Sequence, residues 1–121
     1  MAHSDRDSDL RMVIVVDNQA TDGLLPEHGF SLWIDLGDQR ILFDTGQGQA
    51  LASNAPKLKI DCSRADHLVL SHGHFDHTGG LRHILNQAAE IHVHGHPGIV
   101  QPRYSIHLGI PRPIKMPRWM L

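Results

Sequence analysis

Three histidines and an aspartate fall within six consecutive positions of this chain, directly after the apolar stretch 67–70. The six residues are His72-Gly73-His74-Phe75-Asp76-His77. Neutral imidazole and carboxylate groups are ligands of Zn, Fe and Mn in proteins. In an extended loop His72 and His74 point to the same side, whereas Asp76 and His77 turn to another face. The pattern therefore predicts a site for two neighbouring metal ions. A loop that only caps the helix near Gly79 would need one such side chain, not four.

The run spells His-x-His-x-Asp-His followed by small residues, and it resembles the signature of the metallo-β-lactamase superfamily. Upstream, residues 40–46 read Arg-Ile-Leu-Phe-Asp-Thr-Gly and resemble the first motif of that superfamily. Residues 16–18 and 27–34 are similar to the branch that contains the dihydropterin-forming synthase of methanopterin biosynthesis. The resemblance covers Arg11 to Tyr104.

The resemblance implies an α/β fold, the αββα sandwich, of which the matched region is the N-terminal αβ half with a mixed sheet and flanking helices. It implies that His72 and His74 bind one metal and that Asp76 and His77 bind the second. The metals are expected to be two zinc ions, with Fe or Mn as alternatives. Asp44 would orient a histidine from behind, and Asp76 would also be catalytic by holding the attacking hydroxide in line. The family's third histidine, bridging aspartate and last histidine lie further along and have no counterpart assigned here.

Other polar residues are candidates for substrate binding or for the missing ligands. His28, with its neighbour Glu27, lies in a loop expected to approach the site. Arg103 and Tyr104 are a basic and aromatic pair that suits an anionic group such as a phosphate; a loop crossing the sheet edge is the alternative for this segment. His94 and His96 either supply a third ligand or are strand-end and turn residues. The remaining histidines are expected on the surface or in packing: His3, His67, His83, His92 and His107.

Hydrophobic periodicity predicts the order β, ββ, α, β, α, β, which is typical of an α/β layer with a mixed sheet. The continuous β-branched run Arg11–Val16 is expected to be a strand buried on both faces. Residues 30–36 and 40–43 form a predicted hairpin, and residues 50–55 a short helix stopped by Pro56. The last three predicted elements are a strand over 67–70, a helix over 80–89 and a strand over 91–94.

Length and composition allow one domain and limit the classes of partner. We expect a flexible N-terminus over residues 1–10, a partial metallo-β-lactamase-like domain over 11–104, and an irregular, proline-rich basic tail over 105–121. The formal charge of −2 favours neither nucleic acid nor membrane. No apolar run approaches the roughly 20 residues that span a bilayer. The start of the chain lacks the pattern of a signal peptide, and the single Cys62 has no internal disulfide partner, which together favour a reducing, cytoplasmic setting.

Two functions follow as hypotheses. The first is a metal-dependent hydrolase in which activated hydroxide attacks an ester, amide, thioester or phosphoester, with a dihydropterin-synthase-like activity if the branch resemblance extends that far. Its partners would be a small, phosphorylated substrate and a second copy of the chain or a complementing chain that supplies ligands. The alternative is a truncated, catalytically silent chain with a vestigial metal site, which predicts an exposed apolar sheet face.

Overall fold

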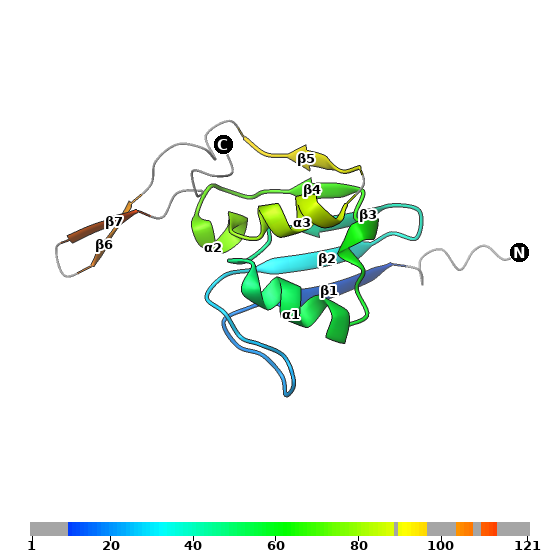
Figure 1. Ribbon diagram of the computed structural model, residues 1–121, viewed down its shortest axis with the longest axis horizontal. Coiled ribbons are helices and arrows are strands. Elements are labelled where there is room, and N and C mark those ends of the chain that lie inside the picture. The colour runs from blue at the N-terminus through cyan, green and yellow to red at the C-terminus, as the bar shows by residue number, and fades with distance from the viewer. Residues whose placement is uncertain (1–9, 89, 97–103, 108–109, 114–121) are drawn as a thin grey trace, which may run out of the picture.

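A five-stranded mixed sheet is the main element of the computed structural model, which describes residues 10–88, 90–96, 104–107 and 110–113. The strands lie in the spatial order β1-β2-β3-β4-β5 (Figure 1). Neighbouring strands from β1 to β3 are antiparallel, and those from β3 to β5 are parallel. Their bounds are β1 Arg11–Val16, β2 Ser31–Asp35, β3 Arg40–Phe43, β4 His67–Val69 and β5 His92–His94. The predicted α/β class with a mixed sheet is confirmed.

Helices cover one face of this sheet. α1 (Gln49–Lys57) and α3 (Leu81–Gln87) both lie in front of the strands in Figure 1, with the short α2 (Phe75–Thr78) beside them and a 3₁₀ turn, η2 (Cys62–Arg64), before β4. Alternation along the strands turns every second side chain toward the helices. Those side chains form the core with the apolar faces of the helices, and its largest members with under 2% exposure are Leu42, Leu51, Leu68 and Ile84.

The opposite face of the sheet is apolar and incompletely covered. Met12 and Ile14 in β1 are 58% and 54% exposed, and the strand register places Leu32, Ile34, Ile41, Phe43 and Val69 on the same face. The prediction that Arg11–Val16 is buried on both faces is therefore wrong. β1 is an edge strand in which Arg11, Met12 and Ile14 are exposed and only Val15 and Val16, at its end, are buried.

Pro56 does not stop α1, which continues to Lys57. A proline lacks the N–H that would join the helical ladder, and its ring crowds the carbonyl four residues before it, but the residues that follow it can still donate. Its carbonyl still accepts a hydrogen bond from the N–H of Lys59 at 3.0 Å, and the N–H of Leu58 reaches the carbonyl of Asn54 at 3.0 Å. The last turn therefore closes around the proline.

The tail residues that the structure describes form a hairpin where the sequence predicted irregular backbone. β6 (Tyr104–His107) pairs with β7 (Ile110–Pro113) in a separate two-stranded sheet. Pro111 and Pro113 occupy alternate positions, opposite Ile106 and Tyr104. In an antiparallel pair alternate positions direct their N–H groups outward, so two prolines spaced in this way leave the pairing intact. Within the described residues, no helix is long and apolar enough to cross a membrane.

Candidate metal centre

The candidate site is built at the ends of β3 and β4. These strands are parallel, so their carboxyl ends meet at one edge of the sheet. Asp44 directly follows β3 and is fully buried, with φ of 57°. Aspartate is one of the few residue types that adopt this left-handed conformation readily. The N–H of Asp44 donates to the carbonyl of Val69 at 2.9 Å, which ties the two strand ends together.

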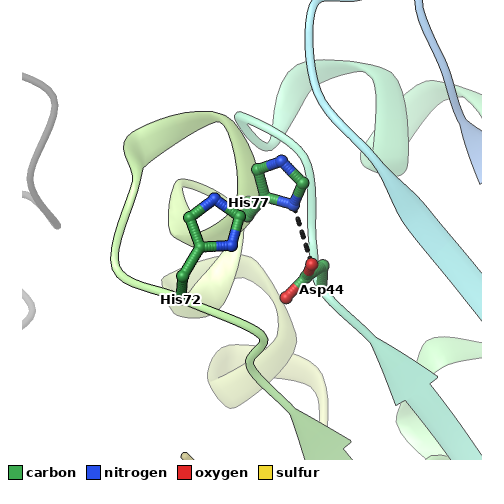
Figure 2. A group of neighbouring side chains, drawn as sticks. All are labelled: Asp44, His72 and His77. Atoms are coloured by element: carbon green, nitrogen blue, oxygen red, sulfur yellow. Dashed lines mark hydrogen bonds and ion pairs between the residues drawn. The ribbon is translucent and has the colours of Figure 1, made fainter. Parts of the chain in front are cut away.

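Asp44 organises two histidines of the motif (Figure 2). Its Oδ1 accepts from the N–H of Ser71 at 2.8 Å, and its Oδ2 accepts from the Ser71 hydroxyl at 2.5 Å and from His77 Nδ1 at 2.7 Å. Because the Ser71 hydroxyl donates its hydrogen bond to Asp44, Ser71 Oγ accepts a hydrogen bond from His72 Nδ1 at 2.7 Å. These hydrogen bonds place the protons of both neutral rings on Nδ1. His72 and His77 therefore each keep an Nε2 lone pair, the arrangement required of a metal ligand.

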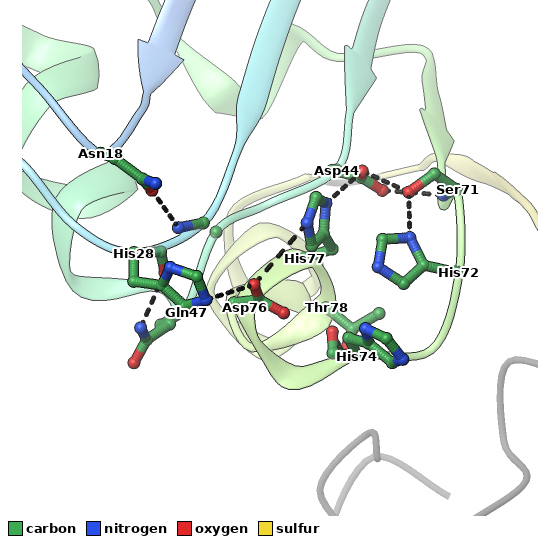
Figure 3. A network of polar contacts seen from close by, with 12 residues as sticks. Asn18, His28, Asp44, Gln47, Ser71, His72, His74, Asp76, His77 and Thr78 are labelled. Atoms are coloured by element: carbon green, nitrogen blue, oxygen red, sulfur yellow. Dashed lines mark hydrogen bonds and ion pairs between the residues drawn. The ribbon is translucent and has the colours of Figure 1, made fainter. Parts of the chain in front are cut away.

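Asp76 faces these lone pairs (Figure 3). Its Oδ2 lies 3.8 Å from His77 Nε2 and 3.1 Å from His28 Nε2. His28 can donate a hydrogen bond to the carboxylate, but the lone pair of His77 and the carboxylate repel each other unless a proton or a cation lies between them. The histidine nitrogens and the carboxylate of Asp76 together therefore suit a metal cation that binds both imidazole and carboxylate.

Two overlapping groups of side chains bring possible ligand atoms within 4.8 Å of one another. One contains His72, His74 and Asp76, and the other contains Asp44, His72 and His77. We assign Asp44 to support rather than ligation, because three hydrogen bonds already occupy its two oxygens. We predicted that Asp76 turns to a face away from His72 and His74. In the structure its carboxylate lies with these two histidines instead. The chain enters α2 at Phe75, and this helical turn carries the carboxylate back toward the two histidines.

The rings of His72, His74 and His77 crowd one another. Ring centroids are 4.4 Å apart for His72 and His74 and 4.2 Å apart for His72 and His77. Burial lowers the pKa of His72, and the neighbouring His77 and His74 lower it further, against the opposing effect of Asp44 and Asp76. A lowered pKa keeps the imidazole neutral near pH 7, which is the form that binds metal.

The loop before β2 holds the site from the other side. Glu27 accepts hydrogen bonds from the N–H groups of Gln47 and Ala50 at 2.8 and 3.1 Å, so it caps the start of α1, where Gly48 offers no side chain. Gln47 in turn donates to the carbonyl of His28 at 2.7 Å. A Cβ at Gly29 would overlap the carbonyl oxygen of Asp76, so only glycine allows this loop to approach so closely.

Sequence reasoning missed Ser71 and Gln47, which connect the predicted residues. Both are small or ordinary polar residues that do not stand out in a single sequence. Glu27, a candidate for substrate binding, has its carboxylate occupied by the start of α1.

Of the remaining candidates, His28 lies beside Asp76 as expected. His94 does not reach the centre, because its Nε2 lies 3.0 Å from His67 Nδ1. His96 lies two residues after the end of β5, Tyr104 begins β6, and Arg103 lies outside the described residues.

The family model of the metallo-beta-lactamase superfamily matches residues 24–119, most of the chain. The chain belongs to the metallo-beta-lactamase superfamily. The resemblance stated from the motif is confirmed, and with it the partial α/β fold.

Of three curated relatives of this chain, two are named for different activities and one is uncharacterized. An uncharacterized protein of Methanocaldococcus jannaschii is 40% identical over 72 residues, 60% of this chain and 28% of its own length. The 7,8-dihydropterin-6-methyl-4-(beta-D-ribofuranosyl)-aminobenzene-5'-phosphate synthase of the same organism is 36% identical over 85 residues, 65% of this chain and 29% of its own. Ribonuclease Z of Bradyrhizobium sp. is 36% identical over 92 residues, 66% and 29%. The chain spans less than a third of the length of each.

Solved structures agree on the fold. A crystal structure described as a metal-dependent hydrolase of the beta-lactamase superfamily superimposes with a TM-score of 0.54 at 39% identity, covering 61% of this chain and 27% of that one. A subclass B3 metallo-beta-lactamase from a soil metagenome library gives a TM-score of 0.53 at 17% identity, covering 75% and 38%, and shows the fold alone.

Proposed function

We propose that this chain carries the first metal-binding motif of a metal-dependent hydrolase, with His72, His74, Asp76 and His77 as ligands of two metal ions, zinc in the first instance. The observation that carries the proposal is the hydrogen-bond network behind the motif. Asp44 and Ser71 hold the Nδ1 protons of His77 and His72, so that both Nε2 lone pairs are available, and the Nε2 of His77 lies 3.8 Å from the carboxylate of Asp76.

When bound, such ions lower the pKa of water from about 15.7 to about 7 and polarise the oxygen of the group under attack. Within this scheme Asp76 orients the attacking water by accepting its hydrogen bond. His28 donates to the same carboxylate at 3.1 Å and restricts its rotation. Asp44 and Ser71 hold the imidazoles in the tautomer that leaves Nε2 free, which is a positioning role.

We propose an ester or phosphoester as the substrate class. Two relatives support a phosphate-containing substrate by their names, a synthase of a 5'-phosphate compound and a ribonuclease. His28 has a side chain that is 70% exposed at the edge of the site, where it can contact a substrate. Arg103 and Tyr104 are proposed to meet the anionic group. A dihydropterin-synthase-like activity is the narrower form of this proposal.

The experiment measures the metal content of the purified, untagged chain and its turnover of a generic phosphodiester and a generic thioester. Both are measured at low and at high chain concentration, because a second copy of the chain could supply ligands. We expect zinc to co-purify and turnover to be lost in His74→Ala and Asp76→Asn. His83→Ala, a change in a half-buried histidine on α3, is the matched control. Turnover that survives both changes at the centre would contradict the proposal.

The second candidate function is a catalytically silent chain that keeps a weaker metal site. The exposed apolar positions Met12 and Ile14 favour it, since it predicts an uncovered sheet face. It is distinguished by the same experiment, because it predicts zinc binding that depends on His74 without turnover of either substrate.

A further inference from the structure

A second cluster of imidazoles lies on the open face of the sheet, on strands β4 and β5. The parallel register pairs His67 with His92 and Val69 with His94. Because side chains alternate between the two faces of a strand, His67, His92 and His94 all project from the face opposite the core. The intervening Leu68, by contrast, is fully buried beneath the helices.

The ring of His67 lies between the other two and contacts both of them. His67 Nδ1 lies 3.0 Å from His94 Nε2, with ring centroids 5.2 Å apart, and the ring of His92 stacks on that of His67 at 5.6 Å. On its other side His67 Nε2 lies 2.8 Å from the side-chain oxygen of Gln39. An amide oxygen only accepts, so the proton of neutral His67 is on Nε2. The Nδ1 lone pair of His67 is therefore directed at His94.

This arrangement has two properties of a metal-binding histidine. The first is a carbonyl acceptor that holds the other ring N–H and fixes the tautomer, as Gln39 does for His67. The second is the spacing, since two nitrogens each about 2.1 Å from one ion are about 3.0 Å apart at a right angle and about 3.4 Å apart at the tetrahedral angle. His92 is exposed on the same strand, two residues before His94, and its ring stacks on that of His67, so a third imidazole lies beside the pair.

The surroundings favour a cation. A hollow of about 490 Å³ opens beside the cluster and is lined by Gln39, Asp66, His67, Glu90 and His92. Its two carboxylates are the charged groups among these residues. We propose that His67, His92 and His94 form a second binding site, separate from the candidate metal centre, for a divalent transition metal ion of the imidazole-preferring class that includes Zn²⁺, Co²⁺ and Ni²⁺.

Such a site would clamp the edge strand β5 to β4. β5 has only three residues and pairs with a single neighbour, so an ion shared between the two strands adds a link that backbone pairing alone does not provide. A metal that binds only the folded state raises the free energy of unfolding by an amount that grows with the logarithm of the metal concentration divided by Kd.

The test is calorimetric titration of Zn²⁺ into the full chain carrying His72→Ala and His74→Ala, so that the candidate centre does not contribute. We expect one ion per chain, together with a rise in melting temperature. In the same background His67→Gln and His94→Gln, each made singly, should weaken binding at least about tenfold, and Gln39→Ala about tenfold through loss of the group that positions His67. His83→Gln is the matched control and should leave binding unchanged.

Circular dichroism of each variant checks that it folds, and the two glutamine variants provide independent tests should one of them unfold. The absence of Zn²⁺ binding in the background chain would overturn the proposal, as would binding that neither His67→Gln nor His94→Gln weakens. In that case the cluster is a hydrogen-bonded group of surface imidazoles. Neither result depends on turnover, so the hydrolase proposal stands or falls separately.

Discussion

Asp44 is the single residue on which the candidate centre depends most. Its carboxylate accepts three hydrogen bonds while the side chain is fully buried. In Asp44→Asn an amide N–H₂ replaces one oxygen and must face a donor on either Ser71 or His77. We expect zinc affinity to fall by about 10- to 100-fold, because His77 loses the acceptor that keeps its proton on Nδ1. Equilibrium dialysis measures the change, and Asp38→Asn in the exposed turn is the control. Unchanged affinity would show that Asp44 does not position the ligands.

Cys62 allows a prediction at the same scale about pH. Burial raises the pKa of this thiol to about 11 from 9.0, helped by the charge of Asp61, and the residue is only 3% exposed. A pKa that is higher in the folded state stabilises the fold below about pH 9, and this contribution is lost as the pH rises toward 11. We expect Cys62 to resist alkylation at pH 8 until the chain is unfolded, and Cys62→Ala to flatten the loss of stability between pH 9 and 11. Rapid alkylation of the native chain would contradict this.

At the scale of elements, Asn54 joins α1 to the sheet and to the loop before β2. Its amide nitrogen donates to the carbonyls of Val15 and Leu25 at 2.9 Å each, and its oxygen accepts from the N–H of Leu25 at 2.8 Å. Asn54→Ala leaves these groups without partners in a buried place, where each costs roughly 1–3 kcal/mol. We expect the free energy of unfolding in urea to fall by about 2–4 kcal/mol. The neighbouring change Ser53→Ala should cost far less, and equal losses would refute the assignment.

At the scale of the whole molecule, the open face of the sheet governs behaviour in solution. Met12 and Ile14 are more than half exposed and continue into a row of half-buried apolar residues across β2 and β3. Exposed apolar surfaces of this kind promote association. We expect the mass measured by light scattering to rise with concentration above the 13.5 kDa of one chain, and the double change Met12→Lys and Ile14→Lys to suppress the rise. Leu85→Lys, on the exposed side of α3, is the control. A mass that stays at one chain would contradict this expectation.

The elements were predictable because hydrophobic periodicity is local. The strands and helices that were predicted over residues 11–94 begin and end within about two residues of their predicted bounds, and the metal motif follows its predicted strand. The short helix α2 inside the motif and the turn η2 were not predicted. The wrong predictions concern segments whose burial or pairing depends on a neighbouring element of the fold. Composition alone predicts that Arg11–Val16 is buried on both faces, but the helices pack on one face of the sheet and leave Met12 and Ile14 exposed on the other (Figure 1). The prolines of the tail are compatible with β7 only because they alternate across a two-stranded pair.

The sequence by itself determined the superfamily, the α/β class and the group of imidazoles and carboxylates, because these depend on residue types at short spacing. Only the tertiary structure decided how those groups meet. The bridge from His72 through Ser71 to Asp44 and His77 joins residues up to 33 positions apart. The pairing of β4 with β5 likewise turned His67 and His94 into neighbours across 27 positions and took His94 away from the candidate centre. Contacts at such separations follow from how strands pair and helices pack, which no local pattern of residues encodes.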